Sequence, residues 1–109
     1  MGNRPTAFIT NRHGMRIALY QHNPTPSLTS GIKGTVIMSH GLSSSSNRPL
    51  FLKTTETFVE AGYRVIRYDA THALSAASDG DPQYCTMTSL REDFEDVIMA
   101  LKAEGPYVA

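Results

Sequence analysis

The residues best suited to chemistry lie in one short run, Ser39 to Leu42 (SHGL), which the serines Ser43 to Ser46 follow. An imidazole can act as a general base, and a serine can act as a nucleophile when a base lies within hydrogen-bond reach. No sequence feature brings a base to these serines. We therefore interpret His40 as the residue that fixes a turn and the serines as a loop, with a backbone N–H of the turn free to point at a reacting oxygen.

An apolar run, Thr35 to Met38, comes directly before this turn and predicts a strand. The run is short, contains β-branched residues and follows Gly34, which favours a strand buried on both faces over a helix. After the serines, Pro49 suits the first turn of a helix that Ser46 or Asn47 caps. This arrangement of strand, turn and helix is one that can aim a backbone N–H at a reacting oxygen.

Two short strands are predicted before this one, from Ala7 to Thr10 and from Arg16 to His22, with a hairpin turn at 11–14. The alternation of side chains in the second strand is typical of a sheet margin with one wetter face. Residues 23–34 are rich in proline, serine and glycine and are predicted to form a loop.

The helix that begins near Pro49 is predicted to end at Gly62, and a strand from Tyr63 to Tyr68 follows it. Strand, helix and strand at this spacing form a right-handed unit, so the two strands should be parallel. Asp69 ends the second of them, and we expect it to hydrogen-bond the loop 70–84 that follows rather than to act as an acid. The apolar stripe of the helix consists of Leu50, Phe51, Thr54, Phe58 and Val59.

A last helix is predicted to begin at Ser89, with Glu92 three residues later completing a capping box, and to end at residues 105–106. The carboxylates of its first turns favour the positive end of the helix, and we expect them to be solvated rather than to bind a metal. Residues 107–109 resemble the start of another buried strand. The apolar stripe consists of Leu90, Phe94, Val97, Ile98 and Leu101, and the carboxylates are Glu92, Asp93, Glu95 and Asp96.

The composition argues against several classes of partner. Ten Lys and Arg residues balance ten Asp and Glu residues, so no charge excess points to nucleic acid or to an anionic membrane. Cys85 is the only cysteine, which excludes an internal disulfide and favours a reducing compartment, here the cytoplasm. No apolar run approaches transmembrane length.

The remaining residues with possible chemistry do not form a site in the sequence. His13, His22 and His72 lack partners at metal-ligand spacing and are interpreted as turn or surface residues. Cys85 has nothing nearby to lower the pKa of its thiol, so we expect it to be inert. The pair Gly31 and Gly34 precedes its strand rather than following it, which excludes a dinucleotide loop. We expect neither a metal nor a cofactor.

Several segments, in their order and spacing, resemble one known family. They are TVIMSHGL at 35–42 with the helix after it, YRVIRYDA at 63–70, SDG at 78–80, and MTSLREDFEDVIMALK at 87–102. The sequence resembles the front half of an α/β-hydrolase, and is most similar to the bacterial serine esterase and serine aminopeptidase-like branch that includes feruloyl and cinnamoyl esterases. The resemblance covers residues 6–109. It implies an α/β fold with two leading strands, then parallel strands with helices on both faces.

The resemblance implies acyl transfer from carboxylic esters or small amides by an activated serine. His40, Gly41 and Leu42 would form the oxyanion loop, in which the backbone N–H of Leu42 is one donor and His40 and Gly41 support the turn. Ser43 and Ser44 would contact the substrate. The loop after Asp69 lacks the glycine-containing turn usual in the family, which leaves the path of that loop open.

The sequence contains no G-x-S-x-G, the motif that carries the nucleophile and the second oxyanion donor in this family. The acid and the histidine follow the nucleophile in the family's chain order. We therefore interpret residues 1–109 as an incomplete α/β-hydrolase domain that ends before the nucleophile elbow, and we expect the chain as given to be inactive.

One alternative of a different class stays open at this point. The chain can instead be a free-standing, non-catalytic α/β module that uses the loop from His40 to Ser46 as a cradle for a small molecule. The incomplete hydrolase and the free-standing module differ in whether the strand Thr35 to Met38 is left as an open sheet edge. If the chain is an incomplete hydrolase, this strand lacks its neighbour on one side. Exposed edges of this kind recruit other strands, so self-association is expected.

Overall fold

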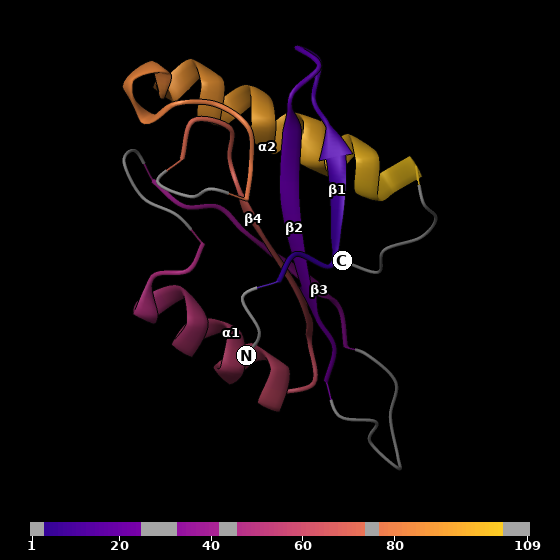
Figure 1. Cartoon of the computed structure of the whole chain (residues 1–109). Helices are drawn as coiled ribbons and strands as arrows, with labels where there is room; N and C mark the ends of the chain where they lie inside the picture. The colour runs from indigo at the N-terminus through magenta and orange to yellow at the C-terminus, as the bar shows by residue number, and fades with distance from the viewer. Residues whose placement is uncertain (1–3, 25–32, 42–45, 74–76, 104–109) are drawn as a thin grey trace.

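The computed structural model describes residues 4–24, 33–41, 46–73 and 77–103, which form one mixed sheet with a helix against each face (Figure 1). The described strands have the spatial order β1-β2-β4-β3. Their bounds are Ala7–Thr10 for β1, Arg16–His22 for β2, Thr35–Met38 for β3 and Arg64–Asp69 for β4; helix α1 spans Pro49–Glu60, the short 3₁₀ helix η1 spans Pro82–Tyr84 and helix α2 spans Met87–Ala103.

The leading hairpin has the predicted bounds. Strand β1 pairs antiparallel with β2, from Ala7 opposite Leu19 to Thr10 opposite Arg16. The turn between them is held by Asn11, whose side-chain oxygen accepts hydrogen bonds from two backbone N–H groups within the turn. The hairpin prediction is therefore confirmed, and β2 continues the sheet by pairing antiparallel with β4.

Strands β3 and β4 are parallel, as the strand–helix–strand spacing predicts. Strand β4 begins and ends one residue later than predicted, at Arg64 and Asp69. Strand β3 has the predicted bounds, but its four residues are half-buried rather than buried on both faces. The reason is its position, because in the described sheet β3 has β4 as its neighbour on one side and forms the edge on the other.

Helix α1 begins at Pro49 as predicted, but its predicted caps are wrong. Arg48 is the N-cap residue and makes no side-chain capping bond, whereas Ser46 is turned toward the sheet. The predicted stripe is also wrong at Leu50, which is 75% exposed, while Thr55 is fully buried and donates to the carbonyl of Phe51. The helix closes at Gly62 as expected, since this residue has a positive φ of 99° that favours glycine.

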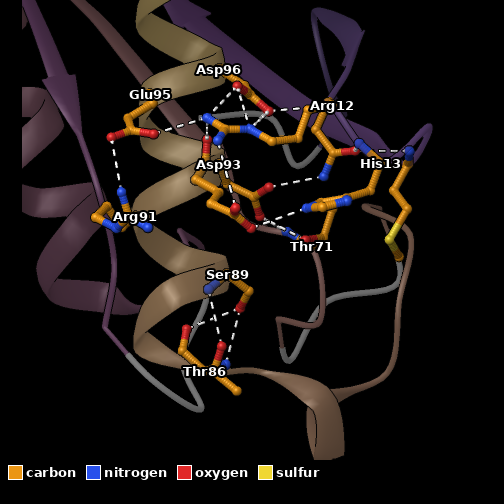
Figure 2. Close-up of polar contacts among 12 residues, drawn as sticks. Arg12, His13, Thr71, Thr86, Ser89, Arg91, Asp93, Glu95 and Asp96 are labelled. Atoms are coloured by element: carbon orange, nitrogen blue, oxygen red, sulfur yellow. Dashed lines mark hydrogen bonds and ion pairs between the residues drawn. The ribbon is translucent and has the colours of Figure 1, made fainter.

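Helix α2 begins two residues before the predicted start, and the predicted capping box is wrong. The N–H of Ser89 donates to the side chain of Thr86, and the N–H of Thr86 donates to the side chain of Ser89, both at 3.0 Å. Thr86 is therefore the cap and Ser89 its reciprocal partner (Figure 2). Glu92 contacts the leading hairpin instead.

The main apolar core lies between the sheet and α2. Val97 and Leu101 are buried there as predicted, whereas Phe94 is 40% exposed. The expectation that the carboxylates of α2 are solvated is wrong for Asp93, which is 1% exposed, because the helix turns this side chain toward the hairpin and β4. The buried members of this core are Ile17, Leu19, Ile66, Tyr68, Ala70, Val97 and Leu101.

The segment after β4 is tied back to β2 through the motif at 78–80. The hydroxyl of Ser78 donates to the backbone carbonyl of Asp69 and accepts from the N–H of Ala18, and Asp79 accepts from the N–H of Arg16. A side chain at Gly80 would place its Cβ 2.4 Å from the ring of His72, so glycine is required there. Within the described ranges, neither helix has the length and apolar character to cross a membrane.

Candidate functional site

His40 lies directly after β3 and uses both ring nitrogens to shape the turn. Its Nε2 accepts a hydrogen bond of 3.0 Å from the backbone N–H of Ala70, so the neutral ring carries its proton on Nδ1. That nitrogen lies 2.9 Å from the carbonyl of Gly41 and donates to it. His40 is 6% exposed. This geometry agrees with a turn-fixing residue and leaves no free nitrogen for a general base.

The other predicted site residues fall at the limit of the described chain. Gly41 is described, and a Cβ added there would meet no atom within 4 Å. Leu42, Ser43 and Ser44 lie outside the described residues, so the oxyanion donor and the substrate contacts stay predictions.

An open groove of about 560 Å³ lies beside this turn, on the face of the sheet that α2 covers. Its volume is in the range of small-molecule sites, and its lining is mostly apolar. The polar pair in its wall is Ser39 and Tyr68, whose hydroxyls lie 2.6 Å apart. Burial raises the pKa of Tyr68 to about 12. The lining residues are Ile37, Ser39, His40, Gly41, Tyr68, Met87, Leu90, Arg91 and Phe94.

The opposite face of the sheet holds a buried charged cluster that the sequence analysis missed. Arg67 of β4 is fully buried, and its Nη1 donates to the carbonyl and hydroxyl of Ser46 and to the side-chain oxygen of Asn47, at 3.2, 2.9 and 2.8 Å. Its guanidinium lies 4.0 Å from the centre of the Tyr20 ring. Burial lowers the pKa of Arg67, against the opposing effect of Tyr20 and Asp69.

Asp69 completes this cluster. Its predicted hydrogen bond to the following loop is made by the backbone carbonyl, which accepts from the hydroxyl of Ser78, while its side chain binds elsewhere. One carboxylate oxygen accepts from the N–H of Ser46 at 2.7 Å, and the other accepts from the hydroxyl of Tyr20 at 2.9 Å. Burial, with the charge of Asp69, raises the pKa of Tyr20 to about 12. The signal available in the sequence was the spacing of Arg67 and Asp69, since residues two apart in a strand share a face.

The remaining histidines do not gather into a site. His13 and His72 lie in turns, as predicted, whereas His22 is half-buried at the end of β2. The Nε2 of His22 accepts from Arg67 at 3.1 Å, and burial together with the charge of Arg67 lowers the pKa of His22. Among the residues that the structure describes, no three His, Cys, Asp or Glu side chains are grouped as a metal site.

Solved structures of α/β-hydrolases share this fold. The chain matches Est1E from Butyrivibrio proteoclasticus, solved with ferulic acid, with a TM-score of 0.80 at 20% identity over 95% of this chain and 39% of Est1E. It matches XC6422 of Xanthomonas campestris, an α/β serine hydrolase without a lid, with a TM-score of 0.72 at 18% identity over 99% and 49% of the two chains. The chain has the fold of the N-terminal part of an α/β-hydrolase.

This α/β-hydrolase part also matches the esterase EaEST from Exiguobacterium antarcticum, with a TM-score of 0.66 at 25% identity over 87% of this chain and 31% of the esterase. It therefore spans less than half the length of each of these three structures. No protein-family profile and no curated protein sequence matches it. The turn at His40 and the groove beside it thus belong to a partial α/β-hydrolase fold.

Proposed function

We propose that this chain is part of a serine hydrolase of carboxylic esters or small amides, to which it supplies the oxyanion loop. The observation that carries the proposal is the turn after β3, where His40 is bonded on one side to Ala70 and on the other to Gly41, within a fold shared with esterases. Such a turn is the support that a backbone donor at Leu42 needs, because an oxyanion donor acts only when it is held in place before the reaction.

In this proposal the chain contributes electrostatic stabilisation and no nucleophile. Negative charge builds on the carbonyl oxygen as the tetrahedral intermediate forms, and the N–H of Leu42 donates to that oxygen. The loss of one such donor typically costs about 3 to 4 kcal/mol of barrier. Ser43 and Ser44 contact the substrate. The nucleophile, the acid and the histidine come from polypeptide outside residues 1–109, since this sequence has no G-x-S-x-G.

The open side of β3 and the groove are the surfaces that we propose the rest of the hydrolase covers. Strand β3 is an edge of the described sheet, and Phe94 and Met87 expose 40% and 68% of their surface at the groove. Among the described residues no strand pairs with the open side of β3, which favours self-association through the edge at Thr35 to Met38.

The first experiment uses the chain as it is. Purified residues 1–109 are assayed with a p-nitrophenyl ester and with a serine-directed phosphonate probe. We expect no turnover and no covalent label, because the oxyanion hole alone leaves only residual catalysis. Covalent labelling between Ser43 and Ser46 together with turnover would contradict the proposal.

The second experiment uses the DNA downstream of codon 109. We expect a G-x-S-x-G within about twenty codons. We also expect the joined chain, which is residues 1–109 continued by the polypeptide that this DNA encodes, to hydrolyse the ester. The matched control replaces the serine of that motif by alanine and should abolish turnover. A stop codon, or an open frame without the motif, would instead favour the binding module.

The binding module is supported by one observation, the groove of about 560 Å³ that this chain forms without further polypeptide. A free-standing module should be a single monomeric species that melts cooperatively. It should also bind an apolar fluorescent probe at one site, with loss of binding when Phe94 is replaced by lysine. A self-associating chain without such a site would exclude this alternative.

A further inference from the structure

The loop between β3 and α1 is tied to the end of β4 at both of its described sides. On the β3 side, the Nε2 of His40 accepts from the N–H of Ala70. On the α1 side, the N–H of Ser46 donates to the carboxylate of Asp69 at 2.7 Å. Asp69 is the last residue of β4 and Ala70 follows it, so one point of the chain holds both described sides of a loop whose residues 42–45 lie outside the described chain.

The anchor at Ser46 involves all the polar groups of that residue. Arg67 donates to its carbonyl and to its hydroxyl, while Asp69 accepts from its N–H. All three residues are fully buried. Hydrogen bonds to ionised partners are roughly twice as strong as neutral ones, and low local polarity strengthens them further. Ser46 is thus fixed in position and in orientation.

The two charged side chains are themselves held from the side of β2. The hydroxyl of Tyr20 donates to the second oxygen of Asp69, and the ring of Tyr20 packs against the guanidinium of Arg67. The Nε of Arg67 donates to His22. Buried charged groups are often no more stabilising than apolar residues of the same volume, so stability alone does not account for this cluster. Its geometry accounts for it better, because every contact orients the two groups that hold Ser46.

We propose that Arg67 and Asp69 are positioning residues that hold the Ser46 end of the oxyanion loop. The role of the anchor in positioning an oxyanion loop rests on the proposed hydrolase function. The hydrogen bonds that form the anchor do not depend on it. The side chains do not contact the substrate in this proposal. They set the place from which the loop acts, as a counterpart to the bond between His40 and Ala70 at the other end.

The anchor is tested by hydrogen exchange of the whole chain, resolved to single amides. Asp69→Asn keeps the shape of the side chain and removes its charge, so the N–H of Ser46 should exchange at least about tenfold faster. The N–H groups that join β2 to β4 should keep their rates. Tyr20→Phe removes only the hydroxyl that orients Asp69 and should accelerate the same amide by about two- to threefold. This second variant preserves the test if Asp69→Asn does not fold.

Asp93→Asn is the matched control, since Asp93 is an equally buried aspartate that binds Thr71 and Asn11 and does not contact Ser46. It should accelerate the amide of Thr71 and leave that of Ser46 unchanged. Unchanged exchange at Ser46 in the folded Asp69 or Tyr20 variant would overturn the proposal, as would equal acceleration in Asp93→Asn. A missing G-x-S-x-G downstream would defeat the hydrolase proposal without altering these rates.

Discussion

The two faces of the sheet each bury one aspartate, and the partners of the two carboxylates differ. Asp93, on the α2 face, accepts from the side chain of Asn11 at 3.0 Å and from the N–H and hydroxyl of Thr71 at 2.7 and 2.6 Å (Figure 2). These donors are neutral. Asp69, on the α1 face, lies beside the buried guanidinium of Arg67 and binds a backbone N–H of the loop before α1.

This difference shows two ways in which a buried carboxylate can organise a fold. Asp93 joins the leading hairpin, the turn after β4 and α2, and it lies beside an apolar core that holds these elements together as well. Asp69 belongs to a cluster in which buried polar and charged groups hold the loop before α1. The α2 face is therefore stabilised mainly by apolar burial, whereas the position of the loop on the α1 face depends on charge.

The strongest way to test this comparison is to remove each carboxylate. Asp69→Ala leaves the buried Arg67 without its counter-charge, and we expect it to lower the free energy of unfolding by about 3 to 5 kcal/mol. Asp93→Ala leaves only neutral donors unpaired, at about 1 to 3 kcal/mol. Denaturant unfolding measures both. Adding Arg67→Met should recover part of the loss in Asp69→Ala, and no recovery would show that charge is not what distinguishes the two faces.

The second prediction concerns the apolar surface at the groove on the α2 face, which we expect to drive self-association. We expect the wild-type chain to self-associate in sedimentation at micromolar concentration, because β3 is an edge of the described sheet and both Ile37 of β3 and the partly exposed Phe94 line the groove. Phe94→Lys should weaken this association by about tenfold or more, since it removes an aromatic ring that association would bury.

Met99→Lys is the control for this variant, because Met99 is 66% exposed on the same helix and does not line the groove. It should leave the association unchanged. A monomeric wild-type chain that melts cooperatively would mean that the chain closes its own edge, and would favour the binding module.

Alkaline titration compares the burial of one tyrosine on each face of the sheet, Tyr20 on the α1 face and Tyr68 on the α2 face. Burial raises the pKa of Tyr20 and of Tyr68 from 10.0 to about 12. Both protonated side chains therefore stabilise the fold fully below pH 10, and this contribution is lost as the pH rises toward 12. In the tyrosinate absorbance of the folded chain, Tyr20→Phe and Tyr68→Phe should each remove one late-ionising group. Loss of an early-ionising group in either variant would show that this ring is not buried as described.

The smallest effect is expected at the exposed contacts around Arg12. This side chain pairs with Glu95 and Asp96 on α2, and its hydrogen bonds lower the pKa of Asp96 (Figure 2). The contribution of Asp96 is present above its ordinary pKa of 3.8 and is lost as the pH falls through the lowered value. Arg12→Ala should therefore lower the melting temperature slightly at neutral pH.

We expect that fall to be less than about a fifth of the effect of Asp69→Ala, because exposed ion pairs contribute little. Molar salt or strong acid should abolish it, and Lys102→Ala, at the far end of α2, serves as a charge-matched control. A loss that persists in high salt would indicate packing rather than charge at Arg12.

Most of the sheet could be predicted from the sequence, but the burial of Arg67, Asp69 and Asp93 could not. Strands β1, β2 and β3 have the predicted bounds because their alternation and flanking turn residues are local signals. The start of α2 was missed because Thr86 and Ser89 cap it in a pair without an acidic residue. The burial of Asp93 was missed because its partner Asn11 is 82 positions away in the sequence.

The oxyanion role of the candidate site stays a prediction. The residues SHGL led us to expect His40 to support a turn, but nothing in the sequence identified Ala70 as the partner of its ring. The cluster around Arg67 was missed for a physical reason: the cost of burying a guanidinium depends on groups from β2 and from the loop before α1, which the fold alone brings together.

The most direct test of the proposed function is the pair Leu42→Ala and Leu42→Pro in the joined chain. We assign the role of Leu42 to its backbone N–H, so alanine should keep most of the activity, whereas proline, which lacks the N–H, should lower kcat by about a hundredfold or more. Circular dichroism checks that both variants fold. Equal activity in folded Leu42→Ala and Leu42→Pro would contradict an oxyanion role for this loop.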